Sequence, residues 1–364
     1  MNTPLHKPKF LKQLITHPEE VIDQLNLIYV NDDELSIVRK KNKKGFSYFL
    51  NGKPLHTEKE IERIKKLVIP PAWENVRIAE LNNGHLQAIG RDLKNRKQYR
   101  YHPLWNKIRN QTKFYKMTSF GEELPKMRAQ IDKDIELSGW PRNKVIAIIL
   151  RLMEETHIRI GSEQYAKRNK SYGLSTLRTR HVTLEKDKMK FEFVGKKGKK
   201  HSVSIKNKKL VKLVNKCEEI PGWELFQYYD EDGIKHRIES GMINEYIHEI
   251  CGELFTAKDF RTWAATVIFF DSMMEIGTVE TQKEADKNVL LGFDAAAKEL
   301  GNTRNVCRKY YVHPFIVELY KNGELDSYFK KVDRIKKPAP YFTPSETVVL
   351  QILKKYVPLF LESS

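Results

Sequence analysis

A change in the spacing of apolar residues near residue 107 limits the possible folds more than any other feature. Residues 25–105 alternate apolar and polar positions and contain turn-forming triplets such as NDD, KKG and NGK, which is typical of β-strands. Beyond Lys107, apolar residues recur every three or four positions, as in residues 126–137 and 141–161, which predicts amphipathic helices. We therefore expect a β-rich region followed by a mainly helical one.

Strands return once within the helical region. Met189, Phe191 and Phe193 fall on one face of a strand, and a GKKGKK turn separates them from Val203 and Ile205, so a hairpin or meander is expected. Two capping boxes (Thr256 with Asp259, Thr343 with Glu346) and a helix-ending glycine at position 301 complete the pattern. Further helices are predicted at about 206–218, 240–250, 257–276, 280–300 and 344–357.

The predicted fold class is α+β, with two domains. A small β-rich N-terminal domain is expected over residues 1–112, and a larger, mainly α-helical domain with a β-hairpin over residues 113–364. The boundary should fall within residues 106–118.

The charge of the chain points to a polyanionic partner. Lys and Arg number 65 against 47 Asp and Glu, which gives a formal charge of +18. Nucleic acid is the first candidate, and an anionic membrane surface is the second. The basic residues are dispersed among aromatics along the chain and do not form one amphipathic helix, which favours nucleic acid.

Other features favour a soluble protein of the reducing cytoplasm. The three cysteines lie far apart, so they predict neither a disulfide framework nor a CxxC metal site. The N-terminus lacks the apolar core of a signal peptide. The apolar runs VIAIIL (145–150) and ATVIFF (265–270) are too short to cross a bilayer and are expected to be buried helix segments.

Five residues indicate a function only when they are considered together. Singly, Arg159 and Arg261 could be buried ion-pair partners, Lys196 a solvated turn residue, Asn302 a helix cap and Tyr311 a packed aromatic. Together they supply the groups that attack on a phosphodiester requires. Guanidiniums bind the non-bridging oxygens, an amide adds a hydrogen bond, a lysine protonates the leaving oxygen, and a phenol near cations becomes a nucleophile.

Five sequence blocks in this order resemble the type IB DNA topoisomerases, in their compact poxvirus-like bacterial form. The resemblance covers nearly the whole chain and implies the catalytic fold that this family shares with tyrosine recombinases. In the last block of the family, the nucleophile lies nine residues after a His or Asn, which selects Tyr311 over Tyr310. The blocks are IGRDLKNRKQYRYHPLW (89–105), HIRIG (157–161), FVGKKGKK (193–200), KDFRTW (258–263) and LGNTRNVCRKYYVHP (300–314).

The resemblance implies relaxation of supercoiled duplex DNA through a 3′-phosphotyrosyl enzyme, strand rotation and resealing. It assigns catalysis to Arg159, Lys196, Arg261, Asn302 and Tyr311, and implies a bacterial, nucleoid-associated monomer that clamps double-stranded DNA. No cofactor is expected, neither ATP nor an obligatory metal, and the sequence has no GxxxxGK[ST] phosphate loop. By the same resemblance, the DNA contacts are Gln98, Tyr99, Arg100, Tyr101 and Lys258.

One residue departs from many members of this family. Asn302 stands where viral and eukaryotic members have histidine. Because an amide cannot become cationic, we expect a site less sensitive to titration near neutral pH.

Two alternatives remain open from the sequence. A tyrosine recombinase would use nearly the same catalytic set, but recombinases usually have histidine three residues before the second arginine, where Lys258 stands here, and they begin with helices. A basic protein that only binds DNA would explain the charge alone, and would form no covalent adduct.

Overall fold

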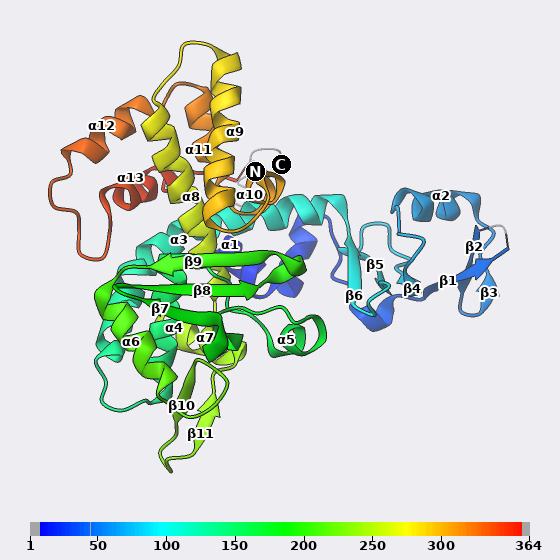
Figure 1. Cartoon of the computed structure of the whole chain (residues 1–364). Helices are drawn as coiled ribbons and strands as arrows, with labels where there is room; N and C mark the ends of the chain where they lie inside the picture. The colour runs from blue at the N-terminus through cyan, green and yellow to red at the C-terminus, as the bar shows by residue number, and fades with distance from the viewer. Residues whose placement is uncertain (1–7, 44, 359–364) are drawn as a thin grey trace. The chain divides into compact units, whose positions relative to one another are not determined.

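The computed structural model describes residues 8–43 and 45–358, which form two compact units. Residues up to Lys113, with Val357 and Pro358, belong to the first unit, and Phe114–Tyr356 form the second (Figure 1). The chain passes from one to the other within a single helix, α3 (Pro103–Ile135). The region predicted to hold the domain boundary is therefore helical.

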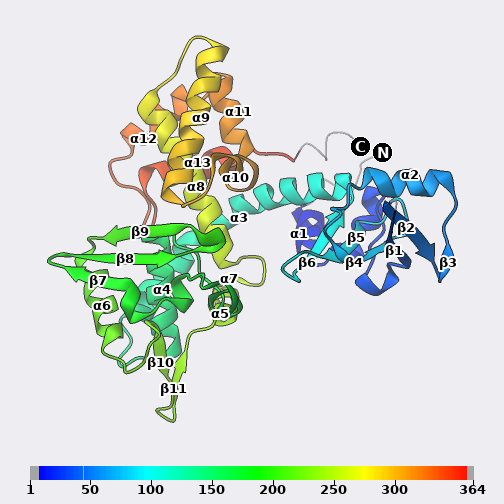
Figure 2. The same cartoon turned by 45° about the vertical axis from the view of Figure 1, so that its right-hand side comes forward.

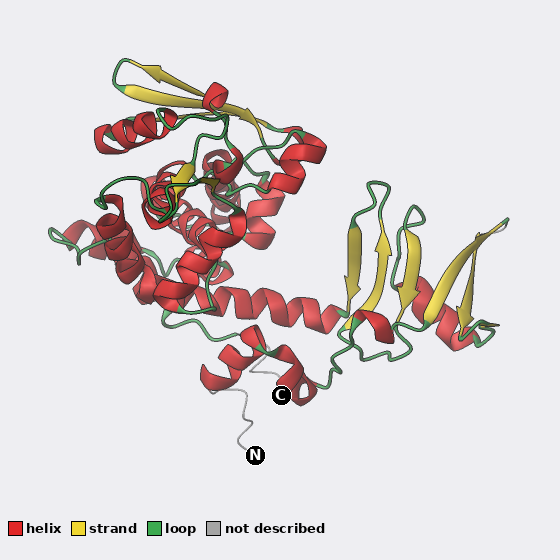
Figure 3. Cartoon of the chain, turned by 90° about the horizontal axis from the view of Figure 1, so that it is seen from below, coloured by secondary structure: helices red, strands yellow, loops and turns green. Residues whose placement is uncertain are grey.

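The first unit is built on a six-stranded sheet in the order β3-β2-β1-β4-β5-β6, with antiparallel neighbours (Figure 3). This confirms the β-rich N-terminal region. Two helices accompany the sheet, α1 (Pro8–Thr16) and α2 (Glu58–Lys66). The strands are β1 (Ile37–Asn42), β2 (Gly45–Leu50), β3 (Lys53–Pro54), β4 (Glu74–Ile78), β5 (Leu86–Arg91) and β6 (Lys97–Tyr101).

Alternating side chains explain how this sheet packs. Ile37 of β1, with Val76 and Ile78 of β4, points into one cluster, and Ile64 of α2 covers it. Helix α2 was not predicted. It is short, and its stability comes from this apolar contact together with acidic residues in its first turn and basic residues in its last, which suit the helix dipole.

The second unit is mainly helical, as predicted, with a three-stranded meander β7-β8-β9 and a small hairpin β10-β11 (Figures 1 and 2). The strands are β7 (Val182–Glu185), β8 (Lys188–Val194), β9 (Lys200–Ile205), β10 (Gln227–Tyr229) and β11 (Lys235–Arg237). The helices are α4 (Arg142–Thr156), α5 (Glu163–Asn169), α6 (Lys208–Glu218), α7 (Ser240–Cys251), α8 (Ala257–Ile276), α9 (Gln282–Glu299), α10 (Arg304–Tyr310), α11 (Pro314–Lys321), α12 (Asp326–Arg334) and α13 (Pro344–Leu353).

Helices α4 and α8 form the centre of this unit. All of Val145–Leu150 is fully buried, and much of the run at 265–270 is buried too, which confirms both as core helix segments. Met189, Phe191 and Phe193 present the apolar face of β8 to the same core. Both predicted capping boxes are formed, at Thr256 and Thr343. Among the described residues, no helix has the length and apolarity needed to cross a membrane.

One helix prediction was wrong at its end, and the error matters for the site. Helix α4 stops at Thr156, and His157 adopts a left-handed conformation with φ of 54°. The residues beyond have no regular secondary structure, and the carbonyl oxygen of Arg159 accepts a hydrogen bond from Leu174 N at 2.8 Å. Gly173 permits this approach, since a Cβ there would lie 2.5 Å from the Arg159 carbonyl oxygen. Arg159 therefore lies on an irregular segment after α4. Helix α13 is also shorter than predicted, since it ends at Leu353.

Candidate active site

Four of the five predicted catalytic residues come together in the second unit. Arg159 follows α4, Arg261 lies in the second turn of α8, Asn302 lies in the turn between α9 and α10, and Tyr311 follows α10. The Arg159 guanidinium donates a hydrogen bond to Asn302 Oδ1. The Arg261 Cζ atom lies 5.6 Å from the centroid of the Tyr311 ring. The first pair joins residues that are 143 positions apart in the sequence, and the second joins residues that are 50 positions apart.

Arg261 is buried, with 4% of its surface exposed, and much of its hydrogen-bonding capacity is unused. Its Nη2 donates to the carbonyl oxygen of Leu300 at 2.9 Å. Its Nε and Nη1 are buried and have no acceptor among the described residues. Burial, with the charge of Arg159, lowers the pKa of Arg261 to about 10, so it is still cationic at neutral pH. A buried cation with two unsatisfied donors is costly unless an anion binds there. A phosphate would supply the two oxygens.

Tyr311 occupies a very different environment from Tyr310. The Tyr311 side chain is 9% exposed, whereas the Tyr310 side chain is 42% exposed. Burial alone would raise the pKa of Tyr311, but the positive charges of Arg261 and Arg159, with a smaller effect of Lys258, outweigh burial and lower it. The phenol is thus biased towards phenolate.

The backbone that carries Tyr311 is attached to helix α8. The hydroxyl of Thr266, fully buried, accepts a hydrogen bond from His313 N at 3.1 Å. The same hydroxyl lies 3.0 Å from the Thr262 carbonyl oxygen and 3.3 Å from that of Tyr311, to which it can donate. Because Arg261 lies on the same helix, these bonds fix the backbone of Tyr311 relative to Arg261.

Asn302 has a defined amide orientation. Gly301, with φ of 61°, turns the chain at the end of α9, as its sequence position predicted, and Asn302 N donates to the Ala297 carbonyl oxygen at 2.8 Å. Its Oδ1 accepts from Arg159, and its Nδ2 lies 3.8 Å from Cys307 Sγ. The amide oxygen therefore already accepts a hydrogen bond, and the NH₂ group is the part of the side chain that can donate a further one.

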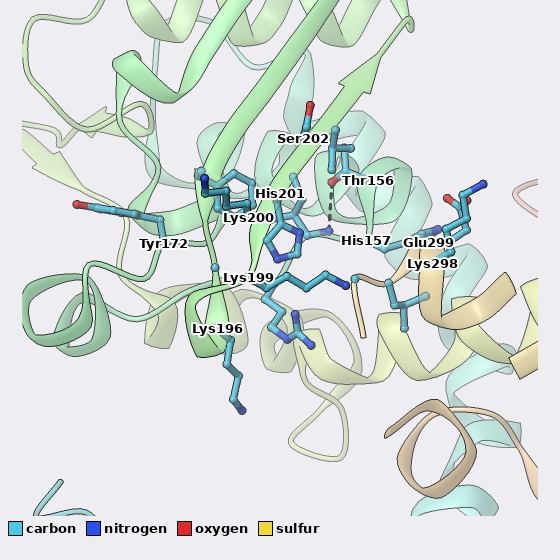
Figure 4. Close-up of a pocket in the computed structure, with 17 residues that line it drawn as sticks. Thr156, His157, Tyr172, Lys196, Lys199, Lys200, His201, Ser202, Lys298 and Glu299 are labelled. Atoms are coloured by element: carbon cyan, nitrogen blue, oxygen red, sulfur yellow. Dashed lines mark hydrogen bonds between the residues drawn. The ribbon is translucent and has the colours of Figure 1, made fainter. Parts of the chain in front are cut away.

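Lys196 lies apart from these four residues. It begins the turn between β8 and β9 and is exposed, and its side chain has no hydrogen-bond or ion-pair partner among the described residues. It shares with Arg159, Lys199, His201 and Gly301 the lining of a pocket of about 160 Å³. Figure 4 shows its side chain extending away from Lys199 and His201. The structure thus places the lysine at the rim of the site.

The predicted DNA contacts lie on β6 and at the start of α8. Tyr99 is 43% exposed, and its ring stacks on Tyr101 with centroids 5.8 Å apart. On the other face of the strand, Gln98 donates to Asp92 Oδ2 at 3.0 Å, and Arg100 donates to the Val68 carbonyl oxygen at 2.6 Å. Lys258 is exposed and stands three residues before Arg261.

Comparisons with known proteins identify the family. Residues 97–338 match the family described as eukaryotic DNA topoisomerase I, catalytic core, and residues 45–92 match bacterial DNA topoisomerase IB, N-terminal domain. DNA topoisomerase 1B of Acanthamoeba polyphaga mimivirus is 36% identical over 291 residues, which cover 78% of this chain and 87% of that protein. The chain belongs to the type IB DNA topoisomerases. The topoisomerase is also 23% identical to DNA topoisomerase 1B of Vaccinia virus (strain Copenhagen) over 236 residues, 64% of this chain and 72% of the viral protein.

This assignment confirms the resemblance on which the predictions were based. The type IB family acts on duplex DNA, so the basic charge of this topoisomerase matches its partner. The assignment favours the topoisomerase over a recombinase and over a protein that only binds DNA. A site-specific recombinase, XerH, aligns over 53% of this chain and 48% of its own, with 21% identity and a TM-score of 0.34, too low to add to the assignment.

Several residues of the site were not found from the sequence. Thr266, Cys307 and the carbonyl of Leu300 contact predicted residues, and His201 lies in the pocket that Lys196 and Arg159 line. Thr266 and Cys307 are small residues within helices, and no local pattern distinguishes them from packing residues.

Proposed function

We propose that this topoisomerase relaxes supercoiled duplex DNA with Tyr311 as its nucleophile. One observation carries the assignment of the residue: the phenol with a lowered pKa lies beside a buried guanidinium that has two unsatisfied donors. That pair combines a nucleophile with a binding site for the oxygens of a phosphodiester.

The proposed reaction is a reversible transesterification. The Tyr311 phenolate attacks phosphorus, a phosphotyrosyl bond forms at the 3′ end, and the bond from phosphorus to the 5′ oxygen breaks. The leaving oxygen takes the electron pair and receives a proton from Lys196, which gives a free 5′-hydroxyl. After the duplex has rotated about its intact strand, that hydroxyl attacks phosphorus and releases Tyr311. The energy of the phosphodiester is kept in the covalent intermediate, so the cycle consumes no ATP.

The other predicted residues stabilise the transition state. Arg159 and Arg261 hold the non-bridging oxygens, and the free N–H of Asn302 adds a hydrogen bond to them. Since Lys196 is exposed at the pocket rim, it must turn inward when DNA is bound in order to reach the leaving oxygen.

Binding of the duplex would use both units. In the first, the exposed ring of Tyr99 and the planar groups of Gln98, Arg100 and Tyr101 on β6 are suited to groove edges and phosphates. In the second, Lys258 supplies a charge near the scissile phosphate. We propose that a monomer acts on chromosomal DNA in the bacterial cytoplasm.

Relaxation of a negatively supercoiled plasmid in EDTA without ATP tests this function. Wild type and Tyr310→Phe should relax the plasmid, and Tyr311→Phe should not, because only the second variant lacks the attacking oxygen. Full activity of Tyr311→Phe would overturn the assignment of the nucleophile. A requirement for both magnesium and ATP would overturn the class of reaction.

A further inference from the structure

The ring of His201 lies between the two chain segments that carry Lys196 and Asn302. His201 is in β9, on the strand after the lysine turn, and it lines the same pocket as Lys196 and Gly301 (Figure 4). The reaction described above assigns no role to this side chain.

Two glycines make room for the ring. A Cβ at Gly195 would lie 2.7 Å from His201 Cδ2 and Nε2, and a Cβ at Gly301 would lie 2.6 Å from Cε1. Each glycine directly precedes a predicted catalytic residue, Lys196 in one case and Asn302 in the other. The imidazole therefore fills the space between the hairpin and the α9–α10 turn, where neither position could carry a larger residue without moving it.

The ring is also held from a third side. It stacks on Phe193, with centroids 5.0 Å apart and an angle of 7° between the planes. A second contact joins the same two segments, since Lys199 Nζ lies 3.5 Å from the Asn302 carbonyl oxygen. The hairpin tip and the turn are thus joined at two points, of which His201 is the packed one.

We propose that His201 is a positioning residue that fixes the Lys196 hairpin against the Asn302 turn, so that the lysine reaches the leaving oxygen. The inference rests on the proposed function, and it deepens the role of Lys196. An exposed lysine on a turn has many orientations, and a rigid base for that turn reduces the number that must be searched when DNA binds.

The environment also favours a neutral ring. Burial lowers the pKa of His201, and the charges of Arg159, Lys199 and Arg261 lower it further. The other charged or titratable groups that line this pocket are His157, Tyr172, Lys196, Lys200, Lys298 and Glu299. A neutral aromatic ring therefore fills the gap without adding a charge to a strongly cationic site.

The test is single-turnover cleavage of a duplex with either oxygen or sulfur at the scissile 5′ bridging position. Sulfur leaves without protonation, so it removes the need for Lys196 but not for the other catalytic groups. With the oxygen substrate, we expect His201→Ala to cleave about 10- to 100-fold more slowly than wild type, a partial loss of the roughly 10²- to 10⁴-fold that a general acid contributes. With the sulfur substrate, its rate should return close to that of wild type, as for Lys196→Ala.

The outcomes separate this inference from the proposed function. An equal loss on both substrates, or no loss on either, would overturn the positioning role of His201. A wild type that forms no covalent adduct with either substrate would overturn the proposed function itself. His236→Ala, which removes an exposed histidine from β11, is the matched control and should cleave both substrates like wild type.

A double-mutant cycle tests the contact directly. Gly195 has φ of −97°, a conformation open to alanine, so Gly195→Ala should disturb the hairpin chiefly through its clash with His201. We expect Gly195→Ala to slow cleavage of the oxygen substrate, and to have little further effect when combined with His201→Ala. Independent, multiplying effects of the two changes would contradict the proposal. Thermal unfolding of each variant shows whether the fold is intact.

Discussion

At the scale of single residues, two adjacent tyrosines show how tertiary structure gives identical side chains different environments. Lys309 lies over the ring of Tyr310, whose side chain faces solvent, while Tyr311 is buried beside Arg261. Both have cationic neighbours, but charges act more strongly where water is excluded. The difference between the two phenols therefore comes from helix α8 and the segment after α4, and not from their shared stretch of chain.

Removing the charge of Arg159 should make Tyr311 harder to ionise. The charges of Arg261 and Arg159 lower the pKa of this phenol against the opposing effect of burial. In Arg159→Gln, the pKa should rise, and the phenolate should appear only at higher pH. Arg159→Lys keeps a cation and should stay closer to wild type. The measurement is an NMR titration of protein labelled with ¹³C at tyrosine Cζ, with Tyr311→Phe to assign the signal. An unchanged pKa in Arg159→Gln would contradict this electrostatic account.

Some of these residues could be predicted from the sequence, and others could not. The order and spacing of the blocks singled out Arg261 and Tyr311, and the structure brings the two together. His201 could not be predicted, because its position matters only once Gly195 and Gly301 approach it from segments about 100 residues apart. A contact between distant segments leaves no periodic signal in either of them.

At the scale of elements, helix α13 packs against and stabilises α8, the helix that carries Arg261. Glu346, nearly fully buried, accepts a hydrogen bond from Trp263 Nε1 at 2.9 Å and a bidentate pair from Arg128 with both distances 2.8 Å. Trp263 stands two residues after Arg261 in α8. Burial raises the pKa of Glu346, but the pairing with Arg128 outweighs it and lowers the pKa, so the carboxylate is ionised at neutral pH.

Glu346→Gln should destabilise the second unit. The change leaves the half-buried Arg128 with Glu154 as its remaining carboxylate, and breaking a largely buried pair costs on the order of 3 kcal/mol in the free energy of unfolding. Urea denaturation near pH 7 measures this loss. Because the folded-state pKa of Glu346 is lowered, its contribution is present above its unfolded pKa and is lost as the pH falls through the folded pKa. The difference in the free energy of unfolding between wild type and Glu346→Gln should therefore become smaller in acid.

A matched control for this prediction is Asp326→Asn. Asp326 pairs with Lys330 on the surface of α12, where ion pairs contribute little. Equal losses for the two variants would show that the Glu346 network is no more important than a surface ion pair.

Element boundaries show where pattern reasoning fails. Ile158 and Ile160 continue the apolar texture of α4, but the chain has already turned at His157 and pairs with Leu174 and Ser175. In contrast, α8 and α9 were predicted closely, because capping residues such as Thr256 and Gly301 mark their ends. Capping residues near in sequence therefore determine the ends of α8 and α9. At Arg159, in contrast, hydrogen bonds to a separate backbone segment prevent the helix that the apolar spacing predicted.

At the scale of the whole molecule, the excess of 18 positive charges should control DNA affinity. Each phosphate that a Lys or Arg neutralises releases a counterion, so affinity falls steeply with salt. Tyr311→Phe, which should bind without cleaving, should lose roughly 10³-fold or more in affinity for duplex DNA between 50 and 200 mM salt, if six to ten phosphates are contacted. Fluorescence anisotropy with a labelled duplex measures this slope. A flat dependence would contradict binding through the phosphate backbone.

The order of the predicted catalytic residues along the chain has a consequence for protein synthesis. Arg159, Lys196 and Arg261 leave the ribosome before Tyr311, and α13, whose Glu346 braces α8, follows later still. A nascent chain therefore carries the predicted catalytic cations before it has the phenol that we propose as the nucleophile. Among the predicted catalytic residues, the proposed nucleophile is therefore the last to be synthesised.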